Sequence, residues 1–103
     1  MLSMIGVQMN DSRRVPGRTA LVSRNIRLDG RRTSIKLEPA FWSALSKVAE
    51  EENVSIHDIC QAVGDRTKGY GLTGAVRVFL LCYMSGASYN SALEAVPVGD
   101  LPE

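Results

Sequence analysis

Cysteine, histidine and long apolar runs are scarce in this chain of 103 residues. Two cysteines, Cys60 and Cys82, stand 22 positions apart without a CxxC pair, and there is one histidine. Neither a zinc site nor a disulfide framework is therefore predicted, and we expect both cysteines to be free thiols in a reducing compartment. The longest nearly apolar run, 75–84, holds an arginine and is about half as long as a membrane-spanning helix.

The amino terminus, MLSMIGVQMNDSRR, has no charged segment before its apolar residues. We therefore expect no signal peptide and no transit peptide, and a cytoplasmic protein. Three early methionines, Met1, Met4 and Met9, leave the true start open.

Residue types for catalysis are also poorly placed. His57 precedes Cys60 by three positions, but nothing in the sequence orients the two as a nucleophile and its base. The glycine-rich segment GDRTKGYG, 64–71, lacks the GK[ST] ending of a phosphate-binding loop. We therefore expect no enzyme activity, no cofactor and no metal.

Positive charge is concentrated near the front of the chain. Residues 13–36 hold eight basic residues and one acid, whereas residues 37–103 hold four basic residues and nine acids. This separation indicates a polyanionic partner for the basic part. A solvated arm whose charge only aids solubility is the alternative.

The pattern divides the chain into three parts. Residues 1–23 lack periodicity and are predicted to be a flexible basic arm, 24–86 a folded domain, and 87–103 a flexible acidic tail. Extended structure is predicted over 20–37, around the turn signal Asp29-Gly30. A β-hairpin is one interpretation, and a loose arm leading into a single strand, 31–37, is the one we adopt.

Three helices are predicted after this strand. Pro39 begins the first, which buries one apolar stripe and ends in an acidic run. Ser55 and Asp58 have the spacing of a capping box and begin the second, which Gly64 ends. The third covers 72–85 and is apolar nearly all round, which predicts a subunit interface.

Alternation along the strand separates two kinds of side chain. Thr33, Ile35 and Leu37 share one face, which suits a core. The other face carries cationic and hydrogen-bonding groups, from Arg32, Ser34 and Lys36. Paired with a second copy, such a strand makes a ribbon that fits the major groove of DNA.

The stretches RRTSIKLEPAFWSAL (31–45), KVAEEENVSIHDI (47–59) and LTGAVRVFLL (72–81) together resemble the ribbon-helix-helix DNA-binding proteins of Arc/MetJ type. The resemblance covers residues 24–85 and includes an extra third helix. It implies a mainly α fold with one short β-strand, as an intertwined homodimer with a two-stranded antiparallel ribbon between the subunits.

The resemblance also implies roles for individual residues. Base contacts fall on Arg32, Ser34 and Lys36. Phosphate contacts fall on the second helix's start and on nearby arginines, namely Ser55, Ile56, His57, Arg24, Arg27 and Arg31. Apolar residues expected at the dimer interface are Ile35, Leu37, Trp42, Phe79 and Leu80. Either 55–63 or 72–85 can be the family's second helix; the latter choice moves the phosphate site to Leu72 and Thr73.

The expected function is sequence-specific binding of double-stranded DNA by a bacterial, repressor-like transcription regulator associated with the nucleoid. Whether dimers assemble into higher oligomers on DNA is left open. One alternative is an antitoxin-type module that binds a protein through the tail 87–103. A second alternative is architectural DNA binding without sequence preference.

Overall fold

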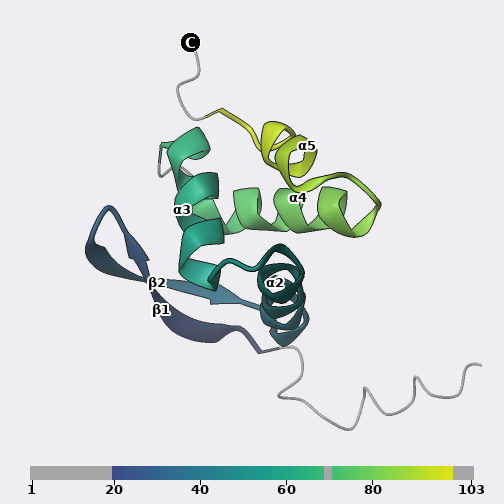
Figure 1. Ribbon diagram of the computed structural model, residues 1–103. Helices are drawn as coiled ribbons and strands as arrows, with labels where there is room; N and C mark the ends of the chain where they lie inside the picture. Colours follow the sequence, from purple (N-terminus) through teal and green to yellow (C-terminus); the bar gives the residue numbers. More distant parts are fainter. Residues whose placement is uncertain (1–19, 69–70, 99–103) are drawn as a thin grey trace, which may run out of the picture.

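The computed structural model describes residues 20–68 and 71–98 of the chain. Strands β1 (Val22–Leu28) and β2 (Arg31–Leu37) form an antiparallel hairpin. Helices α2 (Pro39–Glu52), α3 (Ile56–Thr67), α4 (Leu72–Met84) and α5 (Tyr89–Glu94) follow. The helices gather on one side of the hairpin, with α3 rising from it and α4 and α5 stacked beyond (Figure 1). The predicted order of strand, helix, helix and third helix is confirmed.

The prediction of a single strand is wrong, because residues 22–28 form a second one. Asp29 and Gly30 join the two strands with φ of 53° and 77°. Positive φ at both central residues is typical of a type I′ turn, whose twist matches that of the strands it joins. The folded part therefore begins inside the predicted arm, of which residues 1–19 lie outside the described residues.

Local sequence explains where α2 and α3 begin. Pro39 occupies the first turn of α2, where its missing N–H has no partner to lose. At the start of α3 the Ser55 hydroxyl accepts the Asp58 N–H at 2.9 Å, and the Asp58 carboxylate accepts the Ser55 N–H at 3.0 Å. Both predicted starts, including the capping box, are confirmed.

Helix α3 continues past Gly64 to Thr67, so its predicted end at Gly64 is wrong. Gly64 faces the hairpin, and a Cβ built there would lie 3.5 Å from a methyl group of Leu28. The helix ends instead at Lys68, which has a left-handed φ of 55° and donates its N–H to the Gly64 carbonyl. Packing against β1 holds this glycine in the helix despite its low propensity.

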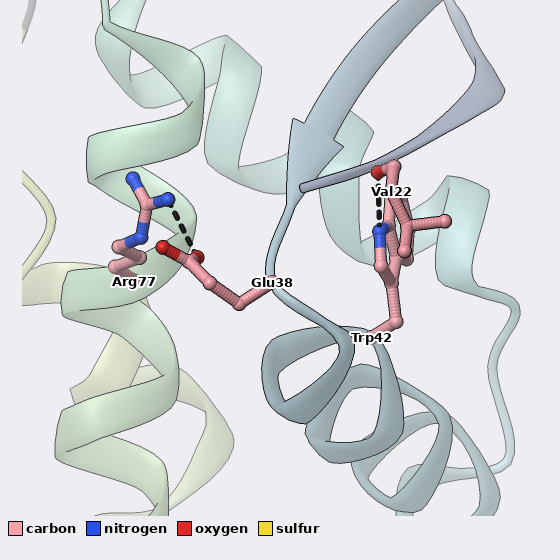
Figure 2. Close-up of polar contacts among 4 residues, drawn as sticks. All are labelled: Val22, Glu38, Trp42 and Arg77. Atoms are coloured by element: carbon pink, nitrogen blue, oxygen red, sulfur yellow. Dashed lines mark hydrogen bonds and ion pairs between the residues drawn. The ribbon is translucent and has the colours of Figure 1, made fainter. Parts of the chain in front are cut away.

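The core lies between the inner face of the hairpin and the four helices. Trp42 seals one end of it, since its indole N–H donates to the Val22 carbonyl at 2.8 Å (Figure 2). Every strand and helix contributes buried apolar side chains, although β1 and α5 contribute one residue each. The largest of the fully buried side chains are Phe79, Ile26, Leu37, Leu45, Ile59 and Leu80.

Part of the predicted flexible tail, 87–103, is structured, whereas residues 99–103 lie outside the described residues. Ser88 caps α5 by accepting the Ser91 N–H, and Ala92 and Val96 are 0% and 1% exposed. Arg66 of α3 donates to the carbonyls of Glu94 and Val96 at 3.0 to 3.2 Å. A cation at these last carbonyls satisfies groups that the short helix cannot satisfy itself.

Replacing Gly64 with alanine should raise the free energy of unfolding by about 0.5–1 kcal/mol. The added Cβ would meet Leu28 at ordinary van der Waals distance, and alanine loses less backbone entropy on folding. Gly30→Ala is the matched control: its φ of 77° should make the same change destabilising. Urea unfolding of both variants checks this, and a less stable Gly64→Ala protein would contradict the packing described.

The capping box should make stability depend on pH. Hydrogen bonds from the Ser55 N–H, and then its hydroxyl, lower the pKa of Asp58. Because the folded value lies below the unfolded one, the stabilisation is complete above about pH 4 and is lost as pH falls through the lowered pKa. Asp58→Asn should therefore be less stable than wild type at pH 6, by a margin that shrinks toward about pH 2. Urea unfolding over this range measures the margin; a constant margin would rule out the carboxylate as its source.

Candidate nucleic-acid interface

The hairpin has two chemically different faces, set by its register. Directly opposed residues share a face, and Arg27 is opposite Arg32, as Asn25 is opposite Ser34. The face toward the helices holds Ile26, Ile35 and Leu37, all buried. We call the other face of the hairpin the outer face. It holds only exposed polar side chains, from Ser23, Asn25, Arg27, Arg32, Ser34 and Lys36.

The outer face is cationic and contains no acid. Arg27 and Arg32 face each other across the ladder, and like charges in directly opposed positions destabilise a hairpin. The hydroxyls of Ser23 and Ser34 lie 2.8 Å apart on the same face. The three predicted base-contacting residues thus lie together, and β1 adds Arg27, predicted to contact phosphate, with two polar side chains that the sequence analysis missed.

One edge of the hairpin is covered near the turn, and the other is open along its length. On the β1 edge, the Arg27 N–H donates to His57 Nδ1 at 3.1 Å and the Asp29 N–H donates to Gln61 Oε1 at 2.7 Å. These acceptors lie one turn apart on α3. Side chains of α3 therefore cover the β1 edge near the turn, while among the described residues no hydrogen bond from outside the hairpin reaches its outward backbone groups at 23 and 25.

The open edge belongs to β2. In an antiparallel ladder, backbone groups point alternately toward the partner strand and away from it. The Arg27 N–H points away from β2, so the backbone of the opposed Arg32, and of Ser34 and Lys36, points away from β1. Among the described residues, no hydrogen bond from outside the hairpin reaches these backbone groups. A strand edge of this kind is a template for pairing with another chain.

The predicted phosphate contacts are not all on one surface. Arg27 is on the outer face, whereas Arg24 and Arg31 are opposite Ile35 and Leu28 and so lie on the helix side. The guanidinium of Arg24 stacks over the Trp42 ring, 5.2 Å from its centroid. Arg24 therefore has a structural partner already.

The amino end of α3 lies beside β1 through the His57 contact. The Ser55 N–H is occupied by Asp58, whereas Ile56 and His57 are in the first turn, where backbone N–H groups have no helical partner. Because His57 Nδ1 accepts the Arg27 N–H, the proton of the neutral ring is on Nε2. The Nε2–H group of His57 therefore does not bond the hairpin and is available as a donor.

The residues predicted for the dimer interface are buried within the chain. Ile35, Leu37, Trp42, Phe79 and Leu80 are 0–7% exposed. Their burial needs no second subunit, and their role at an interface stays a prediction.

An open, mainly apolar groove with a volume of about 420 Å³ lies between α2 and α4. Leu81, 68% exposed, and Met84, 48% exposed, lie along it. At its rim, Arg77 pairs with Glu38 at 2.7 Å (Figure 2). The same guanidinium stacks over the Phe41 ring, 5.4 Å from its centroid. The remaining lining comes from Ala40, Ala44, Val78 and Leu80.

Cys60 has no reactive character in this setting. Burial raises the pKa of its thiol to about 11, which keeps it protonated at neutral pH. Within residues 20–68 and 71–98, no three metal-binding side chains cluster, and no helix is long and apolar enough to span a bilayer.

Comparison with known proteins identifies the fold. Residues 21–84 match the ribbon-helix-helix domain family, so the match includes β1 and extends to the end of α4. An uncharacterized protein from Bordetella pertussis Tohama I has a similar fold, with a TM-score of 0.61 and 23% sequence identity over 78% of this chain and 69% of that one. No curated protein matches. Since the matched region covers more than half of the sequence, the chain belongs to the ribbon-helix-helix family.

Proposed function

We propose that this chain binds double-stranded DNA sequence-specifically as a homodimer and acts as a repressor-like bacterial transcription regulator. Ribbon-helix-helix domains typically bind DNA as dimers. The main support for DNA binding is the outer face, where six exposed polar side chains, three of them cationic, lie beside an open strand edge. A protein of this kind works at the chromosome, which is the basis for a cytoplasmic, nucleoid-associated location.

Dimerisation joins the open β2 edges of two copies. The backbone groups of Arg32, Ser34 and Lys36 gain partners, and the two β2 strands become an antiparallel ribbon. A ribbon of this width enters the major groove, where arginine and lysine donate to the O6 and N7 acceptors of guanine. Ser34 bonds a base as donor or acceptor once its hydroxyl turns from Ser23.

Phosphate is held at the sides of the ribbon. We take α3 as the family's second helix, because its amino end lies beside the hairpin through the contact between His57 and Arg27. The N–H groups of Ile56 and His57 suit an anion, and the helix dipole favours one there. The neutral His57 ring adds its Nε2–H as a further donor.

A second copy also covers the apolar groove between α2 and α4. Both helices contact β2, whereas α3 packs on β1, so the groove is on the side of the open edge. Ala40 and Phe41, which line it, are in the first turn of α2 directly after β2. The groove thus continues the edge along which the partner docks, and burial of Leu81 and Met84 adds apolar area to a ribbon made of polar contacts.

A protein-binding antitoxin function needs a tail that is free to wrap a partner. Residues 89–96 instead pack on α3 and α4 through Arg66 and a T-shaped contact of Tyr89 with Phe79. This observation favours DNA binding as the principal function.

Arg32→Ala should relax sequence preference, because each bidentate base contact is worth about 1–3 kcal/mol of discrimination. Arg31→Ala is the matched control: it removes the same charge one residue away, on the helix side of the hairpin. Selection of bound duplexes from a random pool, at one fixed salt concentration, measures both variants and wild type.

The expected result is a lost base preference for Arg32→Ala and an unchanged preference for Arg31→Ala. Equal preference in all three proteins would count against reading by the outer face. Equal wild-type affinity for every duplex would favour architectural binding.

Leu81→Asp should shift the protein from dimer to monomer without unfolding it, since this side chain is exposed and lines the groove. Phe79→Asp, by contrast, should unfold the chain, since Phe79 is 0% exposed. Leu21→Asp is the control for added charge, because Leu21 is 50% exposed but lies outside the groove. Sedimentation gives the oligomeric state and circular dichroism the fold; a dimeric, folded Leu81→Asp protein would remove the groove from the interface.

A further inference from the structure

Strand β1 presents three hydrogen-bond donors on the outer face. Ser23, Asn25 and Arg27 are exposed and share that face with Lys36, Ser34 and Arg32, to which they are directly opposed. Asn25 and Arg27 have no side-chain hydrogen bond or ion pair to another described residue. A ribbon of two β2 strands alone leaves Ser23 and Asn25 without a function, and it does not say where Arg27 would meet a phosphate.

Pairing through the open edge gives a sheet of four strands in the order β1, β2, β2 of the partner, β1 of the partner. Neighbouring strands are spaced by about 4.8 Å, so β2 lies roughly 2.4 Å and β1 roughly 7 Å from the two-fold axis. The major groove is about 12 Å wide, which places its walls roughly 6 Å from the same axis. The β2 strands fit between the walls, and the β1 strands do not.

We infer that β1 binds the DNA backbone on both walls of the groove while β2 reads the bases, an inference that rests on the proposed function. Arg27 donates to a phosphate and neutralises it. Asn25 and Ser23, farther along the same strand, donate to the same backbone as uncharged partners. These contacts fix how deeply and at which register the β2 strands sit, and they carry no sequence information.

The position of α3 agrees with this division of roles. The backbone of Arg27 is bonded to His57, so the side chain of Arg27 and the first turn of α3 lie along the same outer edge of the sheet. A phosphate strand that follows this edge meets Arg27 and the α3 amino end in succession. Arg24 and Arg31 belong to the opposite face and are outside this track.

The salt dependence of binding tests the inference. Each neutralised phosphate contributes about −0.9 to the slope of log affinity against log salt, so Arg27→Gln should reduce the slope of a dimer by about 1.8. Arg27→Lys should keep the slope. Asn25→Ala should weaken binding with no change in slope, because no charge is lost. Both Arg27→Gln and Asn25→Ala should weaken all duplexes by one common factor, with the selected sequence unchanged.

A chemically altered duplex locates the contact. Replacing single phosphates by uncharged methylphosphonates should weaken wild type at every contacted phosphate, and Arg27→Gln should be indifferent at one symmetric pair of these positions. An unchanged slope, an altered selected sequence or continued sensitivity at all of these positions in Arg27→Gln would overturn the role of β1. If wild type binds no duplex even at low salt, the proposed function itself falls. Circular dichroism of each variant confirms the fold, since the substituted side chains are exposed.

Discussion

The hydrogen bond from the Arg27 backbone to His57 fixes α3 against one edge of the hairpin. A two-stranded hairpin has two edges, and each exposes backbone groups that can pair with another strand. Together with the contact between Asp29 and Gln61, this bond covers the turn end of the β1 edge with side chains of α3. Near the turn, β2 is thereby left as the strand that can pair with another chain. In the proposed dimer the outer faces of two copies would form one continuous surface. The same contacts set α3 beside that surface.

Much of this arrangement follows from local signals. The limits of β2, the division of its side chains between two faces, and the starts of α2 and α3 depend on alternation, a proline and a capping box, all within a few residues. The Asp29-Gly30 turn even sets the register, so the outer-face residues of β1 follow from it. We missed Ser23 and Asn25 because β1 shows weak alternation: Arg24 lies on its inner side, where the Trp42 ring accommodates its charge.

The features that the sequence did not predict depend on distant partners. The path of α3 through Gly64 depends on Leu28, which is brought there by the hairpin. Helix α5 is six residues long and is too short to persist alone, so its order depends on Arg66 and on the burial of Val96. Leu28 is far in sequence from Gly64, and Arg66 is far from α5. The local sequence of each segment therefore does not predict these contacts.

The cations of this chain divide into those that hold the fold and those that do not. Arg66 caps α5, Arg77 pairs with Glu38, and Arg24 stacks on Trp42. Within the described residues, Arg27 and Arg32 instead lie opposite each other with no acid between them. Repulsion between the two guanidinium groups is a local cost of folding. An adjoining phosphate backbone would offset it by attracting both groups. This unfavourable pair, on a face that is otherwise regular, therefore supports the proposed binding of a polyanion.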